Sequence, residues 1–517
     1  MQFEAKKDAP WAAAAALLGM LACWPYLWVL GIGAMSRDAV LWLERSQFGK
    51  PIFFEWVFQT QHFKVGYRPV TGLSYALNGL LGGYRITDLL LHVACVVLVY
   101  VLYRRLAPAL PRWGGLVSAF VMAAHPLAEF VVPHLARRGY PLATAWSLAG
   151  LALLAAPGKA RWLGALCIGL GALSNDAAYA VFVLGALVVL ARDRDRGSLA
   201  ALGAVLVTLL AVRFAVIGGV GGYQTNDRTA RIVPIFFATW DRLLPFFGDI
   251  ELPLAPVRTA LAGLGATLLS AAALWSAAAR DEAGKALALA LAWIVGLTLL
   301  FLPNGVWFPR QVYLLVAPMS LVVGLLAAQL RPDDRTSWLR AAPALAVVLA
   351  VLVRSPVLWG TDPVQQQAWR QTEAIVADLT TAMEQVKRRE KVALVVPFFK
   401  RPSQGGLRAR EGEDRRRADP LGARIIEQRV ENDLGRAKQM GTAALWFADP
   451  AAPQPLGSVS PTGGLGFEVQ AAPATRLSVY AGELLTDDDE GGRGQITIEA
   501  GWLYVHDGAE GRLERVE

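Results

Sequence analysis

Charged residues are scarce in this sequence. Only 18% of its 517 residues are Asp, Glu, Lys or Arg, whereas a soluble domain has about 25%. Hydrophobic residues make up 55% of the chain, and long apolar runs recur through its N-terminal part. This composition excludes an ordinary soluble protein and predicts a chain that crosses a bilayer several times. The net charge of +8 then reflects basic membrane-protein loops and does not indicate a nucleic-acid partner.

Cysteine is scarce too. The three cysteines, Cys23, Cys95 and Cys167, all lie inside apolar runs, and the polar C-terminal region has none. This excludes a disulfide framework or a cysteine zinc site in that region. The first apolar run, from Trp11 to about Ile32, is longer than a signal-peptide core, and we interpret it as a retained span.

Apolar runs of membrane-spanning length indicate the helices. A spanning helix needs about 17–25 mostly apolar residues. We therefore predict a polytopic α-helical membrane domain over residues 1–357 with about eleven transmembrane helices. The expected spans are 11–33, 87–103, 114–132, 141–156, 161–175, 177–191, 198–217, 257–278, 285–302, 312–330 and 341–357.

Basic residues mark every second loop and so predict the orientation. The positive-inside rule places these loops and the N-terminus in the cytoplasm, which corresponds to a multi-pass protein of the inner (cytoplasmic) membrane. The other side then receives loops 34–86, 133–140, 218–256 and 303–311, with the aromatic segment 231–250 in the membrane interface. The basic groups are Lys6-Lys7, Arg104-Arg105-Arg112, Lys159-Arg161, Arg192-Arg194-Arg196, Arg280-Lys285 and Arg331-Arg335-Arg340.

The sequence pattern changes at residue 358. For residues 358–517 it predicts a small extracytoplasmic α/β domain. The segment 365–388 has the pattern of a long amphipathic helix, and 391–399 has that of a buried strand. A charged Gly/Arg/Glu loop follows at 401–417. Further strands are expected at 442–447, 476–481, 495–499 and 501–505.

Ionisable residues gather at the predicted outer boundary of the membrane. Such residues are costly at membrane depth, so they are candidates for function. A carboxylate there can take the proton of a hydroxyl acceptor, and an arginine can bind a lipid phosphate through paired hydrogen bonds. The pattern indicates group transfer from a lipid phosphate to a hydroxyl. The residues are Asp38, Glu44, Glu55, His125, Glu129, Arg137, Arg138, Asn175, Asp176, Arg310 and Tyr313.

Three stretches carry a family resemblance. They are YRPVTGLSYALNGLLGG at 67–83, LLHVACVVLVYVLYRRL at 90–106, and AAHPLAEFVVPHLARRGYPLATAWSLAGL at 123–151. Together they resemble the membrane part of the transmembrane and tetratricopeptide-repeat O-mannosyltransferases, within the wider GT-C class of membrane glycosyltransferases. The resemblance covers roughly residues 30–330, and the tetratricopeptide tail of that family is absent.

The resemblance implies a chemistry and a set of residues. It implies a polyprenyl-phosphate sugar donor, a hydroxyl acceptor outside the cytoplasm and inversion at the sugar carbon. It implies that Asp38 is the base, although Arg37 stands where the family usually has a second acid. It also implies that Arg68 and Asn78 face the site, that Asn175-Asp176 replaces the family's Lys-Glu, and that the Arg-Tyr pattern survives as Arg310 and Tyr313.

Simpler interpretations stand beside these. Asp38 could cap a helix beginning near Ala39, and Glu44 and Glu55 could be solvated or act as secondary acids. The offsets between His125, Glu129 and His134 do not make a strong zinc pattern, so a divalent metal is possible but not indicated. His92 fits a packing histidine bonded to another helix.

Two other functional classes stay open at this level. One is a lipid or solute transporter, although the sequence has no matched halves. The other is a catalytically inactive relative that scaffolds a cell-envelope complex.

Overall fold

The computed structural model describes the helical part of the chain and the backbone of its C-terminal strands. Residues Met1–Leu30 and Arg45–Thr361 form one compact unit, and Gly31–Glu44 with Asp362–Glu517 form a second. The described residues are 5–31, 39, 42–43, 45–49, 53–54, 57–58, 67–156, 160–192, 195–218, 239–240, 242–244, 255–278, 281–301, 309–331, 333–361, 366, 370 and the strands between 392 and 516.

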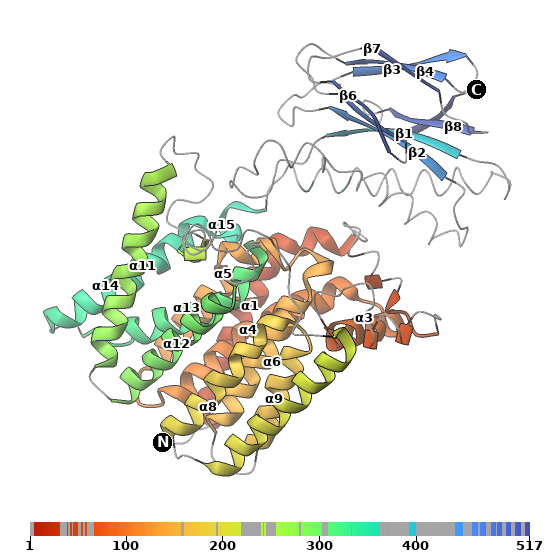
Figure 1. Ribbon diagram of the computed structural model, residues 1–517. Helices are drawn as coiled ribbons and strands as arrows, with labels where there is room; N and C mark the ends of the chain where they lie inside the picture. The colour runs from red at the N-terminus through yellow and green to blue at the C-terminus, as the bar shows by residue number, and fades with distance from the viewer. Residues whose placement is uncertain are drawn as a thin grey trace. The chain divides into compact units, whose positions relative to one another are not determined.

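The first unit is a bundle of apolar helices (Figure 1). Six of its described helical stretches are long and apolar enough to cross a membrane, so the chain is a polytopic membrane protein. The helices are α1 (Ala5–Cys23), η1 (Trp24–Gly31), α3 (Pro69–Leu81), α4 (Tyr84–Leu106), α5 (Arg112–Ala124), η3 (Pro126–Phe130), η4 (Leu135–Arg137), α6 (Gly139–Leu154), α7 (Arg161–Ala172), η5 (Asp176–Tyr179), α8 (Ala180–Arg192), α9 (Arg196–Ile217), α11 (Ala255–Ala277), α12 (Glu282–Phe301), α13 (Pro309–Ala327), α14 (Arg335–Arg354) and α15 (Pro356–Trp359).

The eleven expected spans all fall on helices of this unit, but their lengths differ from the prediction. Six described helical stretches are long and apolar enough to cross a membrane. They are Lys7–Gly31, Tyr84–Leu106, Arg196–Ile217, Glu282–Leu299, Arg310–Ala327 and Arg335–Trp359. α7 and the described end of α11 are shorter apolar helices. The full count of eleven and the orientation therefore stay predictions.

The expected span at 114–132 is interrupted. α5 ends at Ala124, because the residue before a proline avoids the helical region and His125 is extended (φ −62°, ψ 131°) ahead of Pro126. The chain continues as the short 3-10 turns η3 and η4 before α6 begins at Gly139. This break places polar backbone and side chains at one end of the bundle.

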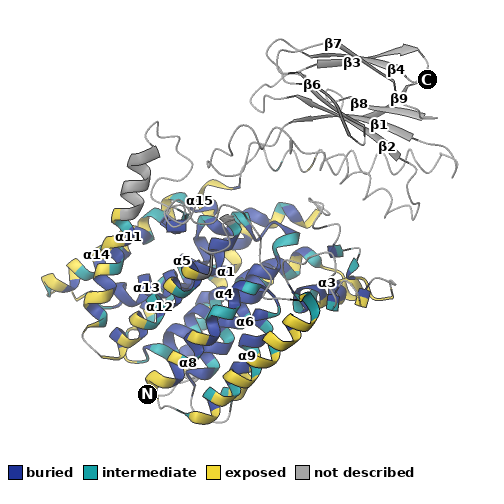
Figure 2. Ribbon diagram, in the orientation of Figure 1, coloured by how far each residue is buried: buried dark blue, intermediate teal, exposed yellow. Residues whose placement is uncertain are grey.

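α13 forms the centre of the unit. It packs against α4, α5, α6, α12 and α14. Of the 18-residue apolar stretch Arg310–Ala327, 94% is buried inside the protein. α5 and α13 approach closely, since a Cβ added at Gly324 would lie 2.4 Å from the carbonyl oxygen of Gly114. Small residues commonly permit such close approach of membrane helices. Figure 2 shows buried residues along the inner helices and exposed ones along α9 and α14.

The second unit contains two sheets. The larger has the order β6-β5-β2-β1-β8-β9, with β1 parallel to both β2 and β8, and the smaller has the order β3-β4-β7. The strands are β1 (Val392–Phe399), β2 (Met440–Phe447), β3 (Gly457–Gly463), β4 (Gly466–Ala471), β5 (Leu477–Ala481), β6 (Glu483–Asp488), β7 (Arg493–Thr497), β8 (Trp502–Asp507) and β9 (Arg512–Val516).

The five strands expected from the sequence coincide with β1, β2, β5, β7 and β8. β3, β4, β6 and β9 were not expected. Most of the helix expected at 365–388, the loop 401–417 and most of the interfacial segment 231–250 lie outside the described residues.

Candidate functional site

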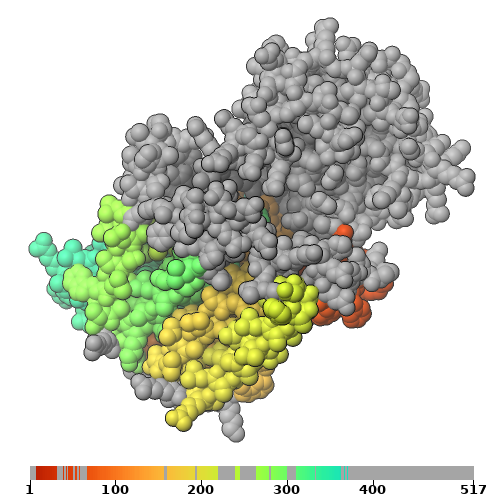
Figure 3. Space-filling model, in the orientation of Figure 1, coloured from red at the N-terminus to blue at the C-terminus, as the bar shows by residue number. Residues whose placement is uncertain are grey.

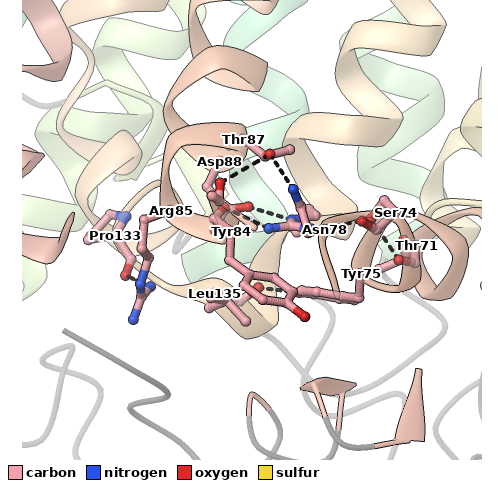
Figure 4. A network of polar contacts seen from close by, with 12 residues as sticks. Thr71, Ser74, Tyr75, Asn78, Tyr84, Arg85, Thr87, Asp88, Pro133 and Leu135 are labelled. Atoms are coloured by element: carbon pink, nitrogen blue, oxygen red, sulfur yellow. Dashed lines mark hydrogen bonds and ion pairs between the residues drawn. The ribbon is translucent and has the colours of Figure 1, made fainter. Parts of the chain in front are cut away.

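The short helix α3 is held against the bundle at its beginning and in its middle. At its beginning, the Val70 backbone N–H donates to the carbonyl oxygen of Leu173 over 3.2 Å, and the Thr71 hydroxyl donates to that of Ser174 over 2.9 Å. Further along, the Tyr75 hydroxyl donates to the carbonyl oxygen of Leu135 (Figure 4). Burial raises the pKa of Tyr75, which keeps its hydroxyl a neutral donor. α3 is thus fixed to segments distant in sequence.

Asn78 closes the turn between α3 and α4. Its amide nitrogen donates to the Gly82 carbonyl oxygen at 2.9 Å and to the Thr87 hydroxyl at 2.8 Å. Gly82 and Gly83 both have φ of 73°, in the left-handed region that favours glycine. The Gly pair of the motif therefore makes the tight connection that lets Asn78 reach α4 (Figure 4).

Arg138 is buried at the centre of this network. Its side chain is 0% exposed, and its Nε donates to Oδ1 of Asp88 at 2.5 Å. Its Nη1 donates to Oδ1 of Asn78 at 2.6 Å. The guanidinium carbon lies 4.3 Å from the centre of the Tyr75 ring, a cation–π distance. Further bonds to the carbonyl oxygens of Ser74 and Tyr84 direct the guanidinium toward the protein.

The two neighbouring arginines of this region also bond to backbone. Arg85 donates to the carbonyl oxygen of Pro133 at 2.8 Å, and Arg137 donates to that of Phe130. Each bond fixes the irregular segment between α5 and α6, where helical backbone bonding is lost.

A second, partly exposed cluster joins α3, η5 and α9. Arg68 immediately precedes α3, and its Nη2 lies 3.5 Å from Oδ2 of Asp176. Arg213 of α9 bonds to the other carboxylate oxygen, Oδ1. The side chains of Arg68 and Asp176 are 30% and 26% exposed, whereas that of Arg213 is 5% exposed. The Asn175 side chain caps η5 by accepting from the Ala177 N–H at 3.1 Å.

Tyr179 lies beside this cluster. The Arg213 guanidinium carbon is 5.6 Å from the centre of its ring. A tyrosine hydroxyl has an ordinary pKa of about 10. The hydroxyl is therefore neutral and can donate a hydrogen bond to an anion.

His125 is fixed at the α5–η3 break. Its Nδ1 accepts from the Leu127 N–H at 3.2 Å. Its Nε2 lies 3.1 Å from the carbonyl oxygen of Leu243, so Nε2 carries the proton. This bond joins His125 to a segment 118 positions further along the chain. Glu129 is half-buried on η3 and interacts electrostatically with Tyr26.

His92 and Tyr313 join α4 to α13. His92 Nδ1 lies 2.9 Å from the Tyr313 hydroxyl and Nε2 lies 3.2 Å from the Ala123 carbonyl oxygen. The carbonyl needs a donor, so Nε2–H donates and Nδ1 accepts from Tyr313. The prediction of His92 as a packing histidine is confirmed. Arg310 is half-buried in the first turn of α13.

The structure brings some predicted site residues together and places others apart. Arg68 meets Asp176, and Asn78 meets Arg138, whereas Tyr313 is fully buried against His92. Asp38, Glu44 and Glu55 lie outside the described residues. Among the residues that are described, no group of three or more His, Cys, Asp or Glu side chains could hold a metal ion.

Two residues of these networks were missed from sequence. Asp88 and Arg213 each lie inside an apolar helix, and an ionisable residue within a span was the available signal. Arg213 is the only charged residue of α9 after its first residue.

Comparisons with known proteins find structural matches only. No protein-family model matches the sequence, and no curated protein matches it. The crystal structure of the Archaeoglobus fulgidus oligosaccharyltransferase in the apo form matches with a TM-score of 0.43 at 12% identity, over 76% of this chain and 63% of that chain. ArnT from Cupriavidus metallidurans bound to undecaprenyl phosphate matches with a TM-score of 0.38 at 15% identity, over 86% of this chain and 94% of that chain.

A third match is the archaeal oligosaccharyltransferase AglB from Archaeoglobus fulgidus in complex with an inhibitory peptide and a dolichol-phosphate. Its TM-score is 0.39 at 12% identity, over 76% of this chain and 63% of that chain. All three matches have TM-scores below 0.5 and identities of 15% or less, and none of the three is named as an O-mannosyltransferase. The chain spans less than two thirds of the archaeal oligosaccharyltransferase.

Proposed function

We propose that this chain is a GT-C-type membrane glycosyltransferase. It transfers a sugar from a polyprenyl-phosphate donor to a hydroxyl group of a protein, lipid or glycan acceptor on the extracytoplasmic face of the inner membrane. The N-terminus is cytoplasmic, and the C-terminal domain lies outside the cytoplasm, as the basic loops favour. The O-mannosyltransferases supply the pattern of residues on which the proposal is built, and mannose is therefore the first sugar to test.

One observation carries the proposal. Two residues of the stretch 67–83 contact other predicted site residues that are distant in the chain. Arg68 contacts Asp176 across 108 positions, and Asn78 contacts Arg138 across 60. A membrane protein that keeps arginines and acids at one end of its bundle retains groups that can bind a lipid phosphate.

The contacts divide the predicted site residues by role. Arg138 and Asn78 bond to other protein groups, so we assign them to positioning α3 instead of to direct phosphate contact. We assign a positioning role also to Tyr313, His125 and Arg137, because each is hydrogen-bonded to another group of the protein. Arg310, Asp176, Arg68 and Glu129 are partly exposed or half-buried and stay candidates for contact with donor or acceptor.

The reaction requires a base and a stabilised leaving group. In the proposed step Asp38 takes the proton of the acceptor hydroxyl, and that oxygen attacks the anomeric carbon as the bond to the lipid phosphate breaks. The departing phosphate gains charge, and a positively charged arginine such as Arg310 stabilises it. Attack opposite to the leaving group inverts the sugar carbon.

The test is sugar transfer by the purified protein in liposomes. The donor is undecaprenyl-phosphate mannose, followed by the glucose and aminoarabinose forms, and the readout is release of undecaprenyl phosphate in the presence of extracts of the cell envelope. Asp38→Asn should lower the rate at least about a hundred-fold, because a positioned base contributes about 10²–10⁴-fold.

Asp333→Asn is the matched control, since Asp333 is an exposed acid in a loop that is predicted to be cytoplasmic. It should leave the rate unchanged. Equal turnover by Asp38→Asn and wild type would refute Asp38 as the base. No release from any donor by a protein that still binds undecaprenyl phosphate would favour the inactive scaffold.

A further inference from the structure

Arg213 has an unusual position for a charged residue. It lies in α9, the most hydrophobic of the six candidate spans, four residues before the helix ends at Ile217. Only 17% of the most apolar 18-residue stretch of α9 is buried inside the protein. The Arg213 side chain is nevertheless 5% exposed, because it turns toward the bundle. A charge in such a place needs an opposite charge, and Asp176 supplies it.

Asp176 does not serve Arg213 alone. One of its carboxylate oxygens contacts Arg213 and the other contacts Arg68. The three groups together therefore carry two positive charges and one negative charge. Two guanidinium groups around one carboxylate repel each other, and an anion with more charge would stabilise the pair better than Asp176 does.

Two further donors belong to Tyr179 and to Asn175, the residue that precedes Asp176. The Arg213 guanidinium carbon lies 5.6 Å from the centre of the Tyr179 ring, and the Tyr179 hydroxyl can donate a hydrogen bond. The amide nitrogen of Asn175, a residue only 3% exposed, has no hydrogen-bond partner among the described residues. A buried donor without a partner is costly and is a reason to expect a ligand or water. The Asp176 and Arg68 side chains, in contrast, remain partly exposed, so the cluster is accessible.

The outer surface of α9 indicates where an anion would come from. Val207, Leu210 and Phe214 are 67%, 44% and 64% exposed, and α9 runs along the face of the bundle shown in Figure 3. This surface has the character of one that faces lipid. Phe214 directly follows Arg213, so a phosphate carried on a lipid can approach Arg213 along the same helix.

We infer that Arg68 and Arg213 form a binding site for the phosphate ester of a membrane lipid, and that Asp176 is its reversible internal ligand. In the absence of phosphate, the Asp176 carboxylate pairs with both arginines. When a phosphate binds, its oxygens replace the carboxylate on one or both guanidinium groups, each of which can donate two parallel hydrogen bonds. This inference deepens the proposed function and rests on it for the identity of the lipid, a polyprenyl phosphate.

The experiment is a titration of the purified full-length protein with undecaprenyl phosphate, followed by native mass spectrometry. Arg68→Gln and Arg213→Gln should each weaken binding by about ten-fold or more, the effect of losing one charge-assisted hydrogen bond. Asp176→Asn should tighten binding by a few-fold, because it removes the competing carboxylate. An ion pair with a purely structural role predicts the opposite for Asp176→Asn, namely unchanged or weaker binding.

Arg161→Gln is the matched control. Arg161 also pairs with an aspartate, Asp195, at 3.7 Å, but it lies at the other end of α7 from Asp176. Its replacement should leave binding unchanged. Should Arg213→Gln fail to fold, lipid binding by Arg68→Gln and Asp176→Asn tests the site without it. Binding that is equal in wild type, Arg68→Gln and Asp176→Asn would overturn the site.

Two further titrations identify the source of the phosphate. Inorganic phosphate at millimolar concentration that displaces the lipid completely, or binds alone with the same variant pattern, supports the anion site but overturns its lipid specificity. Phosphatidylglycerol that binds as tightly as undecaprenyl phosphate overturns the polyprenyl assignment. Sugar transfer that persists while Arg68→Gln binds lipid normally would leave the proposed function standing and remove this site.

Discussion

Arg138 donates a hydrogen bond of 2.5 Å from Nε to Oδ1 of Asp88, and both side chains are almost completely shielded from solvent. The two residues belong to different helical segments, 50 positions apart in the chain. The same guanidinium also bonds to Asn78 of α3. A single buried cation thus connects α3, α4 and the irregular segment before α6.

Removing one member of this pair should destabilise the protein strongly. Arg138→Met leaves Asp88 buried without its cation, and such a loss costs about 3–5 kcal/mol. We expect a clear fall in the unfolding temperature in detergent, measured by intrinsic tryptophan fluorescence. Arg138→Lys should rescue only part of it, because lysine cannot donate to Asp88, Asn78 and Tyr84 in the same planar geometry.

A double variant separates the effect of the ion pair from the effect of changing each side chain. Arg138→Met combined with Asp88→Asn removes both charges, so its cost should be smaller than the sum of the two single variants. Strict additivity of the two costs would show that the ion pair contributes nothing beyond the individual side chains.

The contact between α5 and α13 predicts a steric effect. A Cβ at Gly324 would lie 1.9 Å from Oγ of Ser118 and 2.4 Å from the backbone oxygen of Gly114. Gly324→Ala should therefore force the two helices apart and cost about 1–3 kcal/mol, as overpacking does. The check is thermal unfolding in detergent together with the yield of folded protein from membranes.

Gly203→Ala on α9 is the control for this substitution. Nothing lies within 4 Å of a Cβ at that position, so only the helix propensity changes. Alanine should then stabilise the helix slightly, by up to about 1 kcal/mol. Equal effects at the two glycines would contradict the close approach of α5 and α13.

Hydrophobic patterning allowed much of the helical unit to be predicted. Every expected span overlaps a helix, because a long apolar run in a membrane has few other ways to satisfy its backbone hydrogen bonds. The break after Ala124 was not predicted. The local signal was His125-Pro126, but the apolar residues on both sides preserved the appearance of one span.

The site was less predictable than the helices. From the sequence, Arg138 and Asn78 were both predicted to contact donor or acceptor, and that role stays a prediction. Their contacts with Asp88, Thr87 and the Gly82 carbonyl depend on how α3 folds back on α4, which no local pattern specifies. Ion pairs between distant helices, such as Arg213 with Asp176, require the three-dimensional arrangement to be known.

The His92–Tyr313 hydrogen bond should be measurable as a coupling between α4 and α13. Tyr313→Phe removes the hydroxyl and leaves Nδ1 of His92 buried without its donor, which costs about 1–3 kcal/mol. We expect a lower unfolding temperature for Tyr313→Phe and for His92→Phe. The combination of both should cost less than the sum, since the second change then removes no further bond. Full additivity would argue against the bond.

Asp8 offers a comparison of two arginines on one carboxylate. Its Oδ1 accepts from Arg104 at 3.3 Å and from Arg112 at 2.8 Å, but the side chains of the two arginines are 8% and 33% exposed. Solvent screens the exposed pair, so Arg112→Gln should cost no more than about 1 kcal/mol despite its shorter distance. Arg104→Gln should cost more, because it also removes the bond of 2.8 Å to the Leu110 carbonyl oxygen.

Asp8→Asn should be the most destabilising of the three substitutions, since it leaves the buried Arg104 without its anion. Unfolding temperatures measured in one detergent at low and at high salt give the ranking. Added salt should weaken the contribution of Arg112 and leave that of Arg104 nearly constant, because mobile ions reach only the exposed guanidinium. The reverse ranking of the two arginines would mean that distance outweighs burial at this end of the bundle.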